Sequence, residues 1–237
     1  GAALILLVHR SNFSMHGYVS EPHLEEVLAL AASFQVPVVL DLGSGALYDL
    51  QRFGLPEEPT VQKMLRAGVD VVCFSGDKLV GGPQAGYVVG KKRYLELLRK
   101  HPLARAIRCD KTCLAGCFAT LELYRCGRAE NEIPVLRMLK KTPEELQQQA
   151  QSWRDSIDDG QVVSSLDAVG GGTLPHGELP GIALAIAVAK PHELLKRLRS
   201  KQPAVMARIE KDRLLLHPRT VLEPHENAGV VRALRDL

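Results

Sequence analysis

Short aliphatic runs recur along the first part of the chain, and a polar or glycine-rich cluster follows each of them. The runs at residues 4–8, 36–40 and 69–74 are typical of strands that are buried on both faces. Segments with apolar residues at helical spacing separate the runs, and they predict helices at residues 21–34 and 61–67. Strands that alternate with helices predict an α/β fold with a mainly parallel sheet.

Three polar clusters directly follow these predicted strands. They are Ser11-Asn12, Asp41, and Ser75-Gly76-Asp77-Lys78. Ligands of open α/β sheets bind beyond the carboxyl ends of the strands. We therefore expect the three clusters to converge on one site.

The second part of the chain has a different order of elements. A fourth strand at residues 86–89 and helices at residues 93–100 and 111–124 complete a first domain, which we place at residues 1–135. Thr142-Pro143-Glu144-Glu145 then marks a helix start, with an N-cap, a proline at the first position and acids in the first turn. Further strands are expected at residues 162–166, 182–188, 205–209 and 214–216, and helices at 192–199 and 227–234. Residues 136–237 are thus predicted to form a small C-terminal α+β domain.

Composition restricts the class of protein only mildly. The net charge of +3 and the isoelectric point near 8.6 permit contact with nucleic acid but do not require it, because no lysine/arginine run is long enough to form a dedicated patch. Five cysteines without a framework spacing indicate a reducing compartment, and we expect the cytoplasm. No apolar stretch approaches the ~20 residues that span a bilayer. The apolar opening resembles a core strand and not a signal peptide, which suggests a fragment of a longer protein.

Lys78 is the strongest candidate for a reactive side chain. It lies in the run Ser-Gly-Asp-Lys-Leu-Val-Gly-Gly-Pro-Gln-Ala-Gly at residues 75–86, directly after a predicted buried strand. A lysine held there would be partly desolvated, and its pKa could fall far enough for Schiff-base chemistry. A glycine-rich turn with a solvated lysine is the alternative, and the spacing alone favours that alternative.

Asp41 favours the reactive interpretation of Lys78. A carboxylate at a strand end can bond a protonated pyridine nitrogen, although a lone aspartate could equally cap a turn. Asp41 precedes Lys78 by 37 residues and follows Asn12 by 29 residues. This order resembles that of fold-type-I pyridoxal-phosphate enzymes, and it implies pyridoxal 5'-phosphate as the cofactor.

Longer stretches resemble one family within that class, the bacterial selenocysteine synthases or L-seryl-tRNA(Sec) selenium transferases. They are Asp-Leu-Gly-Ser-Gly at 41–45, residues 74–86, His-Pro-Leu-Ala-Arg-Ala-Ile-Arg at 101–108, Val-Gly-Gly-Gly-Thr-Leu-Pro at 169–175, and residues 207–210 and 213–216. The resemblance covers nearly the whole chain. It implies conversion of seryl-tRNA(Sec) to selenocysteinyl-tRNA(Sec) through an aminoacrylate intermediate, with selenophosphate as the selenium donor.

The resemblance also implies roles for individual residues around the cofactor. Lys78 would bind the cofactor covalently, and Asp41 would pair with its pyridinium nitrogen. Asn12 would bond the ring hydroxyl and Ser75 the phosphate. Asp77 would assist catalysis beside the lysine.

Arg105 and Arg108 resemble the pair that holds the anionic selenium donor in this family. Guanidinium groups grip phosphate oxygens in a forked geometry, which suits this role. A solvated helix face is the alternative for both arginines.

Some parts of the family have no counterpart in this sequence. A preceding segment that supplies the first strands and part of the phosphate-binding loop is missing, as is an N-terminal domain that reads tRNA. The isolated chain could therefore be inactive, although family members form homo-oligomers and this chain could still associate. Two alternatives remain open: a related pyridoxal-phosphate-dependent lyase acting on a small amino acid or amino-sugar acid, and a catalytically silent fragment with an assembly role.

Three cysteines and one histidine are candidates for binding a ligand, but a structural role is the alternative for each of them. Cys109, Cys113 and Cys117 recur every four residues and would share one helix face. Structural zinc needs a second ligand pair, and none is evident, so packed thiols are favoured and no metal is expected. His9 follows the first predicted strand, where it could touch a ligand or form a structural hydrogen bond.

Overall fold

The computed structural model of the chain describes residues 1–11, 13, 15, 17–170, 173–174 and 177–236. The chain forms two compact units. The first comprises Gly1–Leu136 with Val169–Gly177, and the second comprises Arg137–Ala168 with Glu178–Leu237. The segment Val169–Gly177 therefore groups with the first unit, although its neighbours in sequence belong to the second. No helix formed by the described residues is both long enough and apolar enough to cross a membrane.

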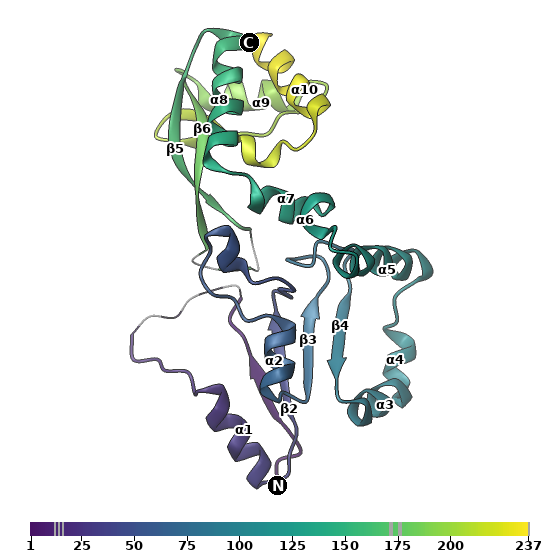
Figure 1. Ribbon diagram of the computed structural model, residues 1–237. Coiled ribbons are helices and arrows are strands. Elements are labelled where there is room, and N and C mark those ends of the chain that lie inside the picture. Colours follow the sequence, from purple (N-terminus) through teal and green to yellow (C-terminus); the bar gives the residue numbers. More distant parts are fainter. Residues whose placement is uncertain (12, 14, 16, 171–172, 175–176, 237) are drawn as a thin grey trace. The chain divides into compact units, whose positions relative to one another are not determined.

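A four-stranded sheet forms the centre of the first unit (Figure 1). Its strands are, in spatial order, β1 (Ile5–Val8), β2 (Val38–Gly43), β3 (Val71–Ser75) and β4 (Gly86–Gly90). The pairs β1–β2 and β2–β3 are parallel, whereas β4 runs antiparallel to β3. The predicted α/β class with a mainly parallel sheet is confirmed. Because β1, β2 and β3 are parallel, their carboxyl ends lie at the same edge of the sheet.

Helices α1 (Leu24–Ser33) and α2 (Val61–Ala67) pack against one face of this sheet. Alternate residues of β2 point to that face, because side chains of a strand alternate between its two sides. The buried core there contains Val27, Ala31, Val38, Leu40, Leu42, Val61, Val72 and Phe74. This packing fixes which residues of β2 and β3 face the helices and which face away from them.

The remaining elements of the first unit are mostly helical. They are η1 (Leu50–Phe53), α3 (Lys92–Lys100), α4 (Pro102–Ala106), α5 (Lys111–Arg125) and α6 (Ala129–Glu132). Helix α7 (Pro134–Lys140) begins in the first unit and ends in the second. Helices α3, α4 and α5 follow the antiparallel strand β4 along the chain (Figure 1).

Three details of the first unit differ from the sequence prediction. Strand β1 is not buried on both faces, because it lies at the edge of the sheet and its Leu6 and Val8 side chains are 58% and 63% exposed. Strand β2 does not stop at Asp41 but continues to Gly43, because pairing with β3 resumes there after an irregularity. Helix α1 begins only after His23, whose backbone is extended.

The second unit combines an antiparallel sheet with helices, as the predicted α+β class requires. The sheet order is β5 (Gln161–Ala168), β6 (Glu178–Ala187), β8 (Arg213–Leu216) and β7 (Arg208–Glu210). The helical elements are α8 (Pro143–Ile157), α9 (Pro191–Arg199), η2 (Pro218–Thr220) and α10 (Pro224–Arg235). Thr142 begins α8 as predicted: its hydroxyl accepts from Glu145 N, and the Glu145 carboxylate accepts from Thr142 N at 2.8 Å.

A buried ionic cluster joins β5 to η2 within the second unit. Asp167 accepts a hydrogen bond from Arg219 Nε at 2.6 Å and lies 2.9 Å from His217 Nδ1. The same guanidinium donates to the carbonyls of Met138 and Pro180 at 3.0 and 2.7 Å. Burial alone would raise the pKa of Asp167, but the hydrogen bonds from His217 and Arg219 hold that pKa below its usual value.

We expect Asp167→Asn to lower the free energy of unfolding at pH 7 by about 3–5 kcal/mol, because Arg219 would keep a buried charge without its partner. The pKa of Asp167 is depressed in the folded state. The Asp167 carboxylate therefore contributes to the free energy of unfolding at pH values above the pKa that it has in the unfolded chain. This contribution is lost as the pH falls through the lower pKa of the folded state. Urea unfolding at neutral and acidic pH measures both effects.

Glu210→Gln is the control, because Glu210 pairs with Arg208 at an exposed position. It should leave the free energy of unfolding nearly unchanged, because solvent screens an exposed ion pair. If Asp167→Asn had the same urea midpoint of unfolding as the wild-type chain at pH 7, this cluster would not stabilise the fold.

Candidate active site

Strand β2 carries Asp41 on the face of the sheet opposite α1 and α2. Its neighbours Leu40 and Leu42 are buried in the core, whereas Asp41 is exposed. In register it lies between Val8 of β1 and Cys73 of β3. Burial and then the charge of Asp41 raise the pKa of the Cys73 thiol. The Asp41 carboxylate itself bonds to none of the described residues, so it is available to a ligand.

A buried carboxylate holds the loop that follows β2. Glu58 is only 5% exposed; it accepts a hydrogen bond from the Ser44 hydroxyl and lies 3.2 Å from His9 Nε2. The hydrogen bond with Glu58 raises the pKa of His9 despite the opposing effect of burial. His9 therefore has a structural partner. No motif in the sequence pointed to Glu58, because it lies 14 residues from Ser44 and 49 from His9 and only the fold brings the three together.

The loops that follow β2 and β3 contact each other directly. Leu79 N donates a hydrogen bond to Ser44 O at 3.2 Å. Gly45 has a φ of +72°, and a Cβ there would lie 2.8 Å from Ser75 O, so this close approach requires glycine. The loop that follows Asp41 and the turn that contains Lys78 are thus bonded together at one edge of the sheet.

Lys78 lies within a compact turn at residues 76–80, immediately after β3. Gly76 N donates to Ala85 O and Gly82 N donates to Gly76 O, both at 2.8 Å. Gly81 N donates to Lys78 O at 3.0 Å. These bonds fix the backbone on both sides of the lysine. The side chain is half-buried, and its amine bonds to no other residue in the part of the chain that the structure describes.

Helix α5 supports the segment that follows Lys78. The Tyr124 hydroxyl donates toward the carbonyl oxygens of Leu79 and Val80, at 3.2 and 3.1 Å. Burial raises the pKa of Tyr124, so the phenol remains a donor at neutral pH. Gly116 of the same helix faces Pro83, where a Cβ would lie 2.6 Å from the proline ring. The packing of α5 therefore depends on the glycine-rich sequence around the lysine.

The cysteines of α5 belong to this packing surface. Cys113 Sγ lies 3.5 Å from Gln84 O, and Cys117 is buried. Burial and the neighbouring Cys109 and Cys117 thiols raise the pKa of Cys113 to about 12, which is typical of an unreactive thiol. Within the described ranges, no group of three or more His, Cys, Asp or Glu side chains could hold a metal ion.

The other residues singled out by the sequence occupy different environments. Ser75 ends β3 and is half-buried, and Asp77 is exposed in the following turn. Arg105 lies in α4 and Arg108 directly after it; both are exposed, and neither bonds to another residue that the structure describes. Asn12 lies outside the described residues. The strand-end residues therefore share one edge of the sheet, whereas the arginines belong to a separate helical segment.

Comparison with known proteins identifies the family. The family described as L-seryl-tRNA selenium transferase matches residues 1–222 of the chain. The chain belongs to this family.

Individual relatives agree with this assignment to the selenium transferases. The L-seryl-tRNA(Sec) selenium transferase of Geobacter sulfurreducens is 46% identical over 244 residues, which cover 99% of this chain and 53% of that protein. The enzyme of that name from Aquifex aeolicus is 41% identical over 238 residues, or 97% and 52% of the two proteins. The chain spans about half the length of the curated relatives it matches.

A solved structure shares the fold of this selenium-transferase family member. It is a D-glucosaminate-6-phosphate ammonia-lyase, with a TM-score of 0.60 and 20% sequence identity. The match covers 99% of this chain and 57% of the ammonia-lyase chain. At this level of identity the similarity concerns the fold and not the reaction.

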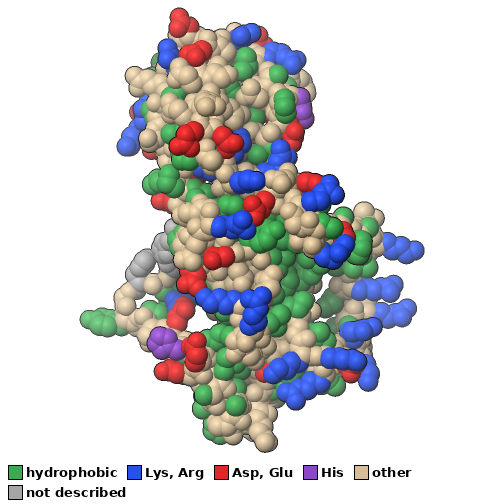
Figure 2. All heavy atoms as spheres, viewed as in Figure 1, with side chains coloured by type: hydrophobic (Ala, Val, Ile, Leu, Met, Phe, Trp, Pro, Cys, Tyr) green, Lys and Arg blue, Asp and Glu red, His purple; other side chains and the backbone are tan. Residues whose placement is uncertain are grey.

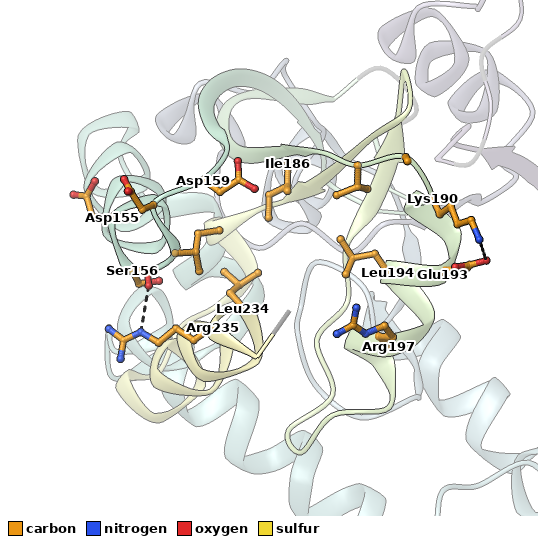
Figure 3. A pocket seen from close by; sticks show the side chains of 14 residues that line it. Asp155, Ser156, Asp159, Ile186, Lys190, Glu193, Leu194, Arg197, Leu234 and Arg235 are labelled. Atoms are coloured by element: carbon orange, nitrogen blue, oxygen red, sulfur yellow. Dashed lines mark hydrogen bonds and ion pairs between the residues drawn. The ribbon is translucent and has the colours of Figure 1, made fainter.

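The second unit contains a cavity of about 800 Å³ that none of the predicted site residues lines. Figure 3 shows Lys190 and Glu193 of α9 paired at its rim, with a distance of 3.1 Å. Arg235 Nε donates to Ser156 O at 3.3 Å on the other side. Its apolar lining includes Ile186, Leu194 and Leu234. This cavity is therefore not the site that the sequence predicted.

The Glu58 cluster leads to a pH-dependent prediction. Glu58→Gln should lower the pKa of His9, because a neutral amide no longer stabilises the imidazolium. The pKa of His9 is raised in the folded state. Its ion pair with Glu58 therefore contributes fully to the free energy of unfolding below the unfolded pKa of about 6.5, and this contribution is lost as the pH rises through the folded pKa. The substitution should therefore destabilise the protein more near pH 6 than near pH 8.5, as measured by urea unfolding.

NMR titration of His9 tests the same prediction at the residue itself. Glu57→Gln serves as the control, because Glu57 pairs with Lys63 at an exposed position and should leave the His9 titration unchanged. If Glu58→Gln also left the pKa of His9 unchanged, Glu58 would not be the group that stabilises the imidazolium.

Proposed function

We propose that this chain carries the lysine-bearing part of a pyridoxal-phosphate-dependent enzyme that converts seryl-tRNA(Sec) to selenocysteinyl-tRNA(Sec), with selenophosphate as the selenium donor. The observation that carries the proposal is the hydrogen bond from Leu79 N to Ser44 O, which joins the loops next to Asp41 and Lys78. Membership of the selenium transferase family supports the choice of substrate. The five free cysteines support an enzyme of the reducing cytoplasm.

The groups at this edge of the sheet fit pyridoxal 5'-phosphate chemically. Asp41, Ser75 and Lys78 supply a carboxylate, a hydroxyl and an amine, and none of the three is engaged by another described residue. A Cβ added at Gly86, beside Ser75 in the sheet, would meet no atom within 4 Å, so there is open space next to the strand end. Bound here, the cofactor would supply an electron sink for charge that develops at the Cα of the seryl group.

Each residue then has a defined task. Lys78 would hold the cofactor covalently and move the proton at the seryl Cα. Asp41 would keep the proton on the ring nitrogen, and Ser75 would donate its hydroxyl hydrogen to the phosphate. Asp77, adjacent to the lysine, would assist the proton transfer.

The two exposed arginines would bind the second substrate. Arg105 and Arg108 bond to none of the described residues, so their guanidinium groups are free to grip the oxygens of an anionic selenium donor. Arginine suits this task better than lysine because its donors form a planar fork.

We also propose that the protein works as a homo-oligomer. Large apolar side chains remain exposed on β1 and α5; Leu6, Leu114 and Phe118 are 58%, 57% and 71% exposed. Apolar surface of this kind is more typical of interfaces than of surfaces that remain in water.

The first test of the function concerns Lys78. Incubation of the chain with pyridoxal 5'-phosphate and then borohydride should attach the cofactor covalently to Lys78, as located by peptide mass. Lys78→Ala should abolish the adduct and the conversion of seryl-tRNA(Sec), because no amine remains to hold the cofactor. Lys196→Ala, at an exposed lysine of α9, should keep both properties. A wild-type chain without the adduct would favour a catalytically silent fragment instead.

The second test concerns Asp41. Asp41→Asn should keep the covalent adduct but lower kcat by roughly 10²-fold or more, because a neutral amide cannot hold the proton on the ring nitrogen. Single-turnover transfer to seryl-tRNA(Sec) measures the rate. Glu26→Gln removes one exposed carboxylate of α1 and should leave the rate unchanged. An unchanged kcat in Asp41→Asn would remove Asp41 from the proposed site.

A further inference from the structure

Residues 91–111, here called the basic surface, carry a net positive charge larger than that of the whole chain. They contain eight Lys or Arg and two acidic residues, a balance of +6, whereas the whole chain carries +3. Figure 2 shows Lys and Arg side chains gathered over the region of α3, α4 and the start of α5. The cations are Lys91, Lys92, Arg93, Arg99, Lys100, Arg105, Arg108 and Lys111. The sequence has no long basic run here, so it is the fold of α3, α4 and the start of α5 that assembles the surface.

Few of these cations are neutralised by neighbouring acids. Asp70 pairs with Lys91 at 2.8 Å and Arg93 at 3.8 Å, and Lys92 lies 3.7 Å from Glu96. The others are exposed and form neither a hydrogen bond nor an ion pair with any residue that the structure describes: Arg99, Lys100, Arg105, Arg108 and Lys111. Their field is therefore available to a partner.

Helix polarity makes part of this distribution of charge unfavourable for folding. Helices α3, α4 and α5 have no acid in their first turns. Lys92 and Arg93 instead occupy the first turn of α3, and Lys111 begins α5. A cation at a helix N-terminus opposes the helix dipole. By contrast, Glu144 and Glu193 occupy the first turns of α8 and α9. Arg99 and Lys100 in the last turn of α3, and Arg105 in the last turn of α4, are placed favourably for the helix dipole. Helix polarity therefore opposes only Lys92, Arg93 and Lys111 of the basic surface.

We propose that the cations of the basic surface other than the two donor-binding arginines, Arg105 and Arg108, bind the phosphodiester backbone of the tRNA substrate. This inference rests on the proposed function, because it takes the partner to be tRNA. Neutralisation of phosphates by Lys and Arg supplies affinity that does not depend on base sequence. Such contacts would anchor a large polyanion and leave its seryl end free for the edge of the sheet that carries Lys78.

A matched pair of double variants tests the proposal. Arg99→Gln with Lys100→Gln removes two unpaired cations of α3 and leaves every proposed cofactor and donor residue intact. Lys196→Gln with Arg199→Gln makes the same change of charge at exposed positions on α9, outside the basic surface. Binding of uncharged tRNA(Sec) to the full chain is measured by fluorescence anisotropy over a salt series.

The α3 double variant should bind tRNA(Sec) about tenfold more weakly at low salt. It should also lower the slope of log K against log salt by about one for each lost phosphate contact. The α9 double variant should match the wild-type chain. Equal affinity and slope in the two double variants, or no binding of tRNA(Sec) by the wild-type chain, would overturn the proposal.

Two further readouts distinguish RNA binding from self-association and from failure of the proposed function. Exposed Leu103 and Ile107 lie among the cations, so the surface could instead contact a second copy of the chain. A change of solution mass in the α3 double variant with unchanged RNA affinity would show this and overturn the proposal. The Lys78 adduct is measured on the same samples. Absence of the adduct from the wild-type chain would refute the proposed function. The affinities of the two double variants for tRNA(Sec) would still decide the role of the basic surface.

Discussion

The parallel pairing of β2 with β3 is the constraint on which the candidate site depends. It places the carboxyl ends of both strands at one edge of the sheet, and the hydrogen bond from Leu79 N to Ser44 O joins the loops that follow. A carboxylate and an amine 37 residues apart in sequence therefore lie at the same edge of the sheet. Glycine at position 45 permits this close approach, since a Cβ there would collide with Ser75 O.

Strand β2 separates structural from chemical roles by its alternation. Leu40 and Leu42 face α1 and α2 and hold the sheet in the core, whereas Asp41 between them faces away. The buried acids have the opposite character. Glu58 is satisfied by two side chains and Asp167 by three, so they organise loops and do not serve as free reactive groups. The contrast between bonded and unbonded carboxylates thus distinguishes supporting residues from candidate catalytic ones.

Much of the fold could be predicted because local signals agreed with the tertiary structure. The aliphatic runs and glycine-rich breaks indicated the strands of the first unit, and Thr142 indicated the start of α8 through its capping box. Predictions failed where a distant partner decides the outcome. The end of β2 at Gly43 depends on pairing with β3, and the exposure of Leu6 depends on the position of β1 at the edge of the sheet. Neither property is encoded within a short window of sequence.

The sequence by itself determined the family, the order of the strands and helices, and the candidate residues Asp41, Ser75 and Lys78. These follow from local composition and from motifs that stay contiguous in the chain. Only the tertiary structure decided that Glu58 bonds both Ser44 and His9, that α5 supports the turn after Lys78, and that α3, α4 and the start of α5 assemble a basic surface. The physical reason is that hydrogen bonds, burial and electrostatic fields act between atoms that are close in space, whatever their separation along the chain.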